Sequence, residues 1–218
     1  MGRALAIPVL LLSPLVADGQ ELDAGQLHLT LDGRRVGTER FRVWRTGSTV
    51  NAVARIEIVQ RAAWEVGLQT DAAFLPTQYE VHEGRATLVS GQRFADRVRF
   101  HFTSPEGERW KEYPLQDAGA ILEPGVAHHY LLLVRALRDT AEGRLALLLP
   151  LVGRSVTARL AGRTEDTVAI GEGSVAATRY DVEIEGVLHR VWLDADDRLL
   201  RVVDPVTKRE AVRAPSEG

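Results

Sequence analysis

The sequence contains no cysteine, which excludes disulfides, thiolate metal sites and a lipid-modified N-terminal cysteine. It also lacks a strong excess of charge of either sign, because 27 basic residues face 30 acidic ones and the net charge is −3. Domains that bind nucleic acids are usually strongly basic. We therefore expect no nucleic-acid partner.

The longest apolar run lies at the N-terminus, from Ala4 to Leu12, after a single positive charge at Arg3. The run is shorter than the roughly 20 residues that span a bilayer. Ala17-Asp18-Gly19 then supplies the small residues that a signal peptidase requires. We predict a cleavable signal peptide over residues 1–19, and hence a periplasmic or secreted protein that is peripheral to the membrane at most.

From Gln26 onward apolar and polar residues alternate, which is the period of a half-buried β-strand. About a dozen such stretches follow one another, separated by turn sequences such as Asp32-Gly33 and Glu185-Gly186. We predict one β-rich domain over residues 20–213 and a flexible tail over 214–218. An antiparallel sheet with one apolar face closes into a barrel, pairs with a second sheet or curls around a helix.

One segment departs from this pattern, because Tyr130, Leu133, Val134 and Leu137 recur at helical spacing. The spacing predicts an amphipathic helix from Val126 to Leu137. The predicted fold is therefore mainly β, a curved antiparallel sheet that forms a half-barrel or open barrel with one amphipathic helix.

Three stretches resemble a group of uncharacterised exported proteins of the bacterial envelope. They are Leu31 to Phe41 (LDGRRVGTERF), Val191 to Val202 (VWLDADDRLLRV), and His129-Tyr130 with the leucines that follow. The resemblance implies a partly open β-barrel, similar to the periplasmic lipoprotein carrier and related lipid-binding half-barrels. It brings no established catalytic residues.

No motif in the sequence predicts catalysis, so we expect neither an enzyme nor a cofactor. A G-x-S-x-G nucleophile elbow is absent. His128 and His129 are adjacent and would point about 100° apart on a helix, so they are unsuited to hold one metal ion. We expect one of them to line the junction of helix and sheet and the other to be solvated. Asp194, Asp196 and Asp197 predict a turn, because an EF-hand loop needs Gly at the sixth position.

Arginines beside aromatic residues are the candidates for ligand binding. Pairs such as Arg97 and Arg99 share one face of a strand; they either hold an anionic head group or lie on a solvated outer face, which is the commoner case. The predicted ligand-binding residues are Trp44, Trp64, Phe100, Tyr130, Arg42 and Arg99, with no catalytic residue and no metal.

We therefore predict an exported binding protein that holds a lipid or another hydrophobic ligand. The alternative is a structural or assembly module of the envelope that binds a protein partner through a sheet edge. An enzyme is the third hypothesis.

Overall fold

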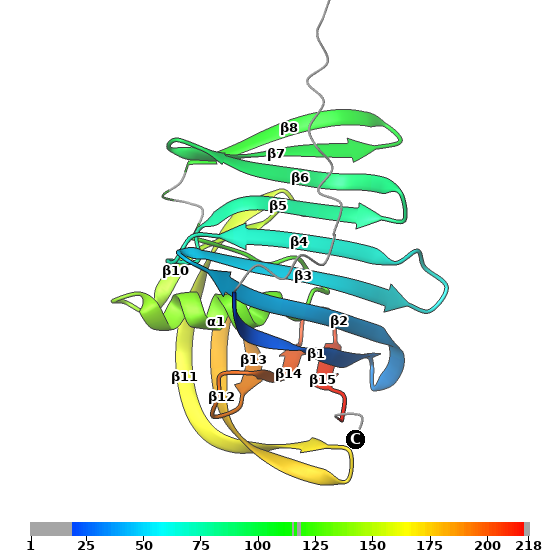
Figure 1. Ribbon diagram of the computed structural model, residues 1–218, viewed down its shortest axis with the longest axis vertical. Coiled ribbons are helices and arrows are strands. Elements are labelled where there is room, and N and C mark those ends of the chain that lie inside the picture. Colours follow the sequence, from blue (N-terminus) through cyan, green and yellow to red (C-terminus); the bar gives the residue numbers. More distant parts are fainter. Residues whose placement is uncertain (1–18, 115, 117–118, 216–218) are drawn as a thin grey trace, which may run out of the picture.

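The computed structural model describes residues 19–114, 116 and 119–215, which form one long curved sheet around one α-helix (Figure 1). The 15 strands pair in the order β8-β7-β6-β5-β4-β3-β2-β1-β15-β14-β13-β12-β11-β10-β9. All neighbours are antiparallel except β9 and β10. The elements are β1 (Gln20–Leu31), β2 (Arg34–Thr46), β3 (Thr49–Ile58), β4 (Trp64–Thr70), β5 (Pro76–Glu83), β6 (Ala86–Phe94), β7 (Arg97–Ser104), β8 (Gly107–Pro114), β9 (Ala120–Ile121), α1 (His129–Asp139), β10 (Arg144–Leu149), β11 (Arg154–Ile170), β12 (Gly173–Ile184), β13 (Val187–Leu193), β14 (Leu199–Asp204) and β15 (Arg209–Arg213).

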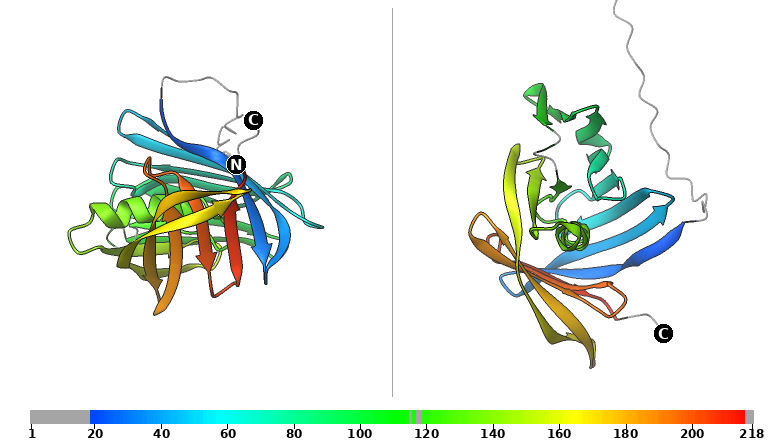
Figure 2. Two further views of the ribbon diagram at one scale, coloured as in Figure 1. Left: turned by 90° about the horizontal axis from the view of Figure 1, so that it is seen from below. Right: turned by 90° about the vertical axis from the view of Figure 1, so that its left-hand side faces the viewer.

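The sheet is open, because its end strands β8 and β9 do not pair with each other in the described part of the chain. Across the opening, the Lys111 ammonium on β8 donates a hydrogen bond to the Gly153 carbonyl between β10 and β11. Seen along α1, the sheet curls around the helix (Figure 2, right). The predicted fold class, a curved antiparallel sheet with one helix, is confirmed.

Two-residue turns set the register of the sheet where the sequence predicts them. Asp32 and Gly33 both have positive φ (49° and 75°), as do Glu185 and Gly186 (51° and 80°). This is the turn whose backbone twist matches that of the flanking strands. The predicted Asp-rich turn is also present, since Asp194 Oδ1 accepts hydrogen bonds from the N–H groups of Asp196 and Arg198.

The hydrophobic core lies inside the curve, between the sheet and α1. Phe41 and Val43 of β2 are buried there, whereas Arg40 and Arg42 alternate with them and are exposed. The helix is less amphipathic than predicted, because among its 11 residues only Arg135, Arg138 and Asp139 are not buried. It fills the curved sheet as its central core element.

The helix and two strands depart from the simple pattern. The helix, predicted from Val126 to Leu137, runs from His129 to Asp139. Residues 154–170 form one continuous strand, β11, with a bulge between Leu160 and Gly162. Phe94 ends β6 opposite Arg97, is 44% exposed and packs under the Arg99 guanidinium.

A second, smaller apolar cluster lies on the opposite face of the sheet. It contains Val168, Ala177, Trp192 and Leu200. Val191 and Leu199 belong to the main core, so their neighbours Trp192 and Leu200 point to the other side. The outer half of the β11–β12 hairpin thus covers the outside of β13 and β14.

The predicted signal peptide lies, except for Gly19, outside the described residues, and the last three residues of the predicted tail do too. Both remain predictions. Within the described ranges, no helix is long and apolar enough to cross a bilayer.

Candidate ligand-binding site

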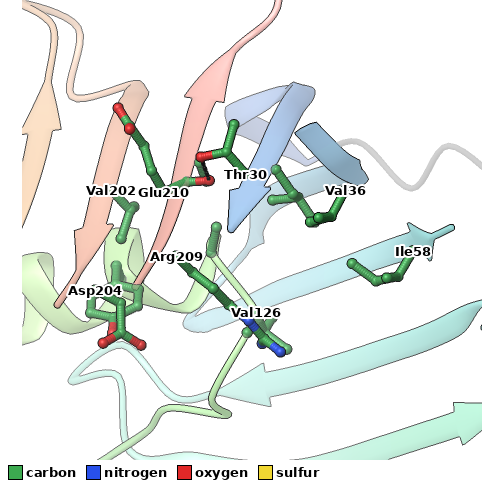
Figure 3. Close-up of a pocket in the computed structure, with 13 residues that line it drawn as sticks. Thr30, Val36, Ile58, Val126, Val202, Asp204, Arg209 and Glu210 are labelled. Atoms are coloured by element: carbon green, nitrogen blue, oxygen red, sulfur yellow. Dashed lines mark hydrogen bonds between the residues drawn. The ribbon is translucent and has the colours of Figure 1, made fainter. Parts of the chain in front are cut away.

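A pocket opens at the end of the sheet where the hairpins β1–β2 and β14–β15 turn, in front of the loop that leads into α1 (Figure 3). Its cavity volume is about 40 Å³, and the pocket is partly open to solvent. Its wall is mostly apolar. The lining residues are Leu29, Thr30, Val36, Ile58, Gly125, Val126, Ala127, Tyr130, Val202, Asp204, Arg209, Glu210 and Ala211.

Arg209 is the cationic side chain of the pocket. It extends from β15 toward Val126, along the loop before α1 (Figure 3). Its Nη1 lies against Gly125, where an added Cβ would collide with it. Gly125 has a φ of +92°, a conformation that side-chain-bearing residues rarely adopt. The glycine therefore provides both the turn and the space in which the guanidinium lies.

No acceptor in the described part of the chain forms a hydrogen bond or ion pair with the Arg209 guanidinium. Its cross-strand neighbour is Asp204, whose carboxylate would be the obvious partner. That carboxylate instead accepts hydrogen bonds within its own turn, from the N–H groups of Val206 (3.0 Å) and Thr207 (3.2 Å) and from the Thr207 hydroxyl (2.7 Å). The adjacent Glu210 pairs with Arg201 at 2.6 Å.

Tyr130, which lines the pocket, is hydrogen-bonded to a buried histidine, His189. The Tyr130 hydroxyl and His189 Nδ1 are 2.9 Å apart and share a hydrogen bond, and the Asp204 carboxylate lies 3.6 Å from the same nitrogen. Burial lowers the pKa of His189, against the opposing effect of Asp204. The ring is therefore neutral near pH 7, and Tyr130 is fixed in place.

The loop in front of α1 is anchored by a buried carboxylate of β2. Glu39 is fully buried, and its two oxygens accept hydrogen bonds from the N–H groups of Ala127 (2.7 Å) and His128 (2.8 Å). The first N–H groups of a helix lack partners within the helix, so a carboxylate there satisfies them and complements the helix dipole. Glu39 Oε1 also lies 2.7 Å from His128 Nδ1. This anchor also explains why α1 begins at His129 and not at Val126.

Both histidines are fully buried, so the expectation that one of them is solvated is wrong. The His128 ring stacks on Phe41, and His129 Nδ1 accepts a hydrogen bond from the Glu123 N–H at 3.1 Å. The Nε2 atoms of both rings are buried with no hydrogen-bond partner in the described structure. Alternation along β2 directs Glu39 toward the core. His128, which contacts the Glu39 carboxylate, is buried with it.

Glu123, just before the loop, is a second buried carboxylate. It accepts hydrogen bonds from the Leu151 N–H (3.1 Å) and the Tyr79 hydroxyl (3.3 Å). Burial raises the pKa of Glu123 to about 7, although both hydrogen bonds favour its ionised form. Burial, with a smaller contribution from His128, holds the pKa of His129 well below its ordinary value.

The six residues predicted to bind a ligand do not form one site. Tyr130 lines the pocket, whereas Phe100 is fully buried in contact with Tyr79 and Tyr113. Trp64 packs at the margin of the core and donates a hydrogen bond to Glu83.

The other three of these residues lie on the outer face. Arg42 pairs with Glu21 and packs near the Trp44 ring, and Arg99 pairs with Glu112. These arginines thus occupy the solvated outer face that was the alternative to binding. Their predicted role in binding remains untested.

Sequence reasoning missed Arg209, Gly125 and Glu39. Glu123-Pro124-Gly125 has the composition of a turn, but nothing near it in the sequence indicates that an arginine 84 positions later along the chain lies against it. Arg209 lies in a short strand of mixed polarity, Arg209–Arg213, whose inner face cannot be assigned from alternation alone. In the described ranges, no group of three or more His, Cys, Asp or Glu side chains has the geometry of a metal site.

Comparison with known proteins yields a fold likeness alone. Neither a protein-family model nor a curated protein sequence matches the chain. Among solved structures, the chain is similar to a β-barrel-like protein of a domain of unknown function (DUF1849) from Brucella abortus. The two chains share 11% sequence identity with a TM-score of 0.49, over 87% of this chain and 93% of the other.

Proposed function

We propose that the protein is an exported, non-catalytic binding protein that holds a small hydrophobic ligand in the pocket beside Tyr130. The observation that carries this proposal is the apolar wall of the pocket, formed by side chains such as Val36, Ile58 and Val126. Small-molecule sites are typically concave and mostly apolar, with a few fixed polar groups. The export part of the proposal depends on the N-terminal apolar segment.

The construction of the site supports this proposal. The loop that closes the pocket is fixed by Glu39, and Tyr130 is fixed by His189. A preformed pocket binds without having to order its own wall, so more of the contact energy appears as affinity. Burying one methylene group contributes about 0.8 kcal/mol.

The size of the pocket restricts the ligand. At roughly 10–15 Å³ for each water-sized group, the cavity volume of about 40 Å³ holds about three such groups, and the rest of a ligand lies toward the open side. The end of a single alkyl chain fits this cavity, whereas the two chains of a phospholipid cannot enter it together. The proposed ligand is therefore a single-chain molecule.

A filling substitution tests this function with the neutral probe decanol. Ile58 lines the pocket, and its neighbour Val59 is 69% exposed and does not. We expect Ile58→Trp to weaken decanol binding at least tenfold in calorimetric titration, and Val59→Trp to leave it unchanged. Failure of the wild-type protein to bind decanol, or equal binding by both variants, would contradict the proposal.

The sheet edge supports a second candidate function, the binding of a protein partner. In the described structure β8 pairs on one side only, and its Trp110 is 63% exposed. An extended segment of a partner can add to such an edge. A pull-down from envelope extracts tests this candidate by comparing the wild-type protein with Lys111→Pro, which disrupts the edge strand. Recovery of the same partner in equal amounts by both proteins would contradict it.

A further inference from the structure

An unpaired guanidinium in the pocket indicates the head group of its ligand, an inference that rests on the proposed function. The pocket contains two carboxylates, Asp204 and Glu210, and one guanidinium, that of Arg209. Asp204 accepts hydrogen bonds within its own turn, and Glu210 pairs with Arg201. Among the described residues, neither carboxylate forms an ion pair with Arg209, so the N–H donors of its guanidinium are available to a ligand.

We infer that Arg209 selects single-chain amphiphiles with an anionic head group, which binds the guanidinium while the alkyl chain lies against Val36, Ile58 and Val126. A guanidinium presents paired N–H donors that match a carboxylate or a phosphate in a bidentate arrangement. In an apolar surrounding such a charge-assisted bond is stronger than in water.

The backbone around Arg209 leaves room for its guanidinium inside the pocket. The guanidinium lies against Gly125, in a place that any larger residue there would occupy. Backbone pairing with Asp204 at the end of the β14–β15 hairpin sets the position from which the Arg209 side chain extends. The side chain therefore lies within the pocket, between the hairpin and the loop.

Four probes with the same alkyl chain test the inference: decanoate, decyl phosphate, decanol and decyltrimethylammonium. Calorimetric titration with the wild-type protein is expected to give affinities about ten- to a hundredfold higher for the two anions than for decanol, and the weakest binding for the cation. The order of decanoate and decyl phosphate shows which anionic head the site prefers. Added salt is expected to weaken the binding of the anions more than that of decanol.

Three substitutions sharpen the test. Arg209→Gln is expected to bring the affinities for decanoate and decanol to within about twofold of each other. Arg209→Lys is expected to keep part of the preference for anions, since the charge remains and the paired N–H donors are lost. The matched control is Lys208→Gln, which removes the same charge one residue away, where the lysine is 71% exposed and pairs with Asp32 at 3.5 Å. The control should behave as the wild type does.

The outcomes separate this inference from the proposed function. If all four probes bind with equal affinity, or if Lys208→Gln reduces the preference for anions as much as Arg209→Gln does, the role of Arg209 is overturned and the hydrophobic pocket stands. If neither decanol nor any charged probe binds, the proposed function itself fails. Thermal unfolding of each variant, followed by circular dichroism, establishes that it is folded before the titrations are compared.

Discussion

Two arginines on strand β15, both on the inner side of the sheet, have opposite surroundings. Arg213 is fully engaged: Nε donates to the Leu199 carbonyl (2.6 Å), Nη1 to the Ala24 carbonyl (3.0 Å) and Nη2 to the Asp23 carboxylate (2.6 Å). Arg209, four residues earlier, has no such partner among the described residues. A buried cation is normally paired, so Arg213 has a structural role and Arg209 is the one available to a ligand.

The largest effect is expected from replacing Arg213, the fully engaged arginine. Arg213→Gln leaves the Asp23 carboxylate buried without its cation, and we expect a loss of about 3–5 kcal/mol in the free energy of unfolding. Burial already raises the pKa of Asp23, and Arg213 opposes that rise. Urea denaturation monitored by circular dichroism measures the loss.

A double variant checks the cause of this loss. Asp23→Asn removes the charge that Arg213→Gln leaves unpaired, so the double variant should recover part of the lost stability. Additive losses from the two single substitutions would mean that the ion pair is not what stabilises this corner of the sheet.

The second prediction concerns Glu123, a buried carboxylate whose partners are neutral, in contrast to Asp23. Because burial raises the pKa of Glu123 from 4.5 to about 7, the folded protein holds a proton that the unfolded chain releases within this range. Stability from this group is therefore present below pH 4.5 and is lost as the pH rises to about 7, by about 3 kcal/mol in total. Glu123→Gln should remove this dependence in unfolding titrations across that range.

The contribution of His129 to stability depends on pH in the opposite direction. Its pKa is lowered from 6.5, so its contribution is present above pH 6.5 and decreases as the pH falls through this value. In Glu123→Gln the remaining profile should therefore rise with pH where the Glu123 contribution in the wild type falls. A wild type and variant that differ by a constant amount from pH 4 to pH 8 would contradict the raised pKa of Glu123.

Much of the fold could be predicted from the sequence, because strands and turns depend on residues close together in the chain. Alternation in β1 and β2 and the Asp32-Gly33 turn specify a hairpin within residues 20–46. The site could not be predicted in this way, because its contacts join residues that are far apart in the chain. Glu39 binds the backbone of Ala127 and His128 almost 90 positions along the chain, and Arg209 meets Gly125 across a similar separation.

Polarity in the sequence does not separate the inner arginine from the outer ones. Arg42 and Arg99 neighbour aromatic residues in sequence, yet alternation puts them outside the sheet, where glutamates pair with them. Arg209 has no aromatic neighbour in sequence, but β15 places it inside. Which polar residue lies inside depends on the curvature of the whole sheet and on the position of the loop before α1, and neither has a local sequence signal.

The third prediction alters the space that Arg209 occupies and leaves the arginine itself intact. Gly125→Ala places a methyl group where Nη1 lies, on a residue whose φ of +92° already disfavours a side chain. We expect it to cost about 1–2 kcal/mol in unfolding free energy and to remove the preference for decanoate over decanol.

Gly186→Ala is the matched control, because Gly186 has a φ of +80° and no atom within 4 Å of an added Cβ. It should lose a similar amount of stability through backbone strain and keep the wild-type order of ligand affinities. If Gly125→Ala also keeps that order, the close approach of Arg209 to Gly125 is not needed for selecting the head group.

The smallest expected effect completes the comparison between the two arginines. Arg209→Gln removes a guanidinium that has no hydrogen bond or ion pair in the described structure, so its free energy of unfolding should lie within about 0.5 kcal/mol of the wild-type value. Adding decanoate should then raise the melting temperature of the wild type more than that of Arg209→Gln, because at the same concentration a ligand of higher affinity stabilises the folded state more. A loss of stability as large as that of Arg213→Gln would show instead that Arg209 supports the fold, and the two arginines would no longer differ in role.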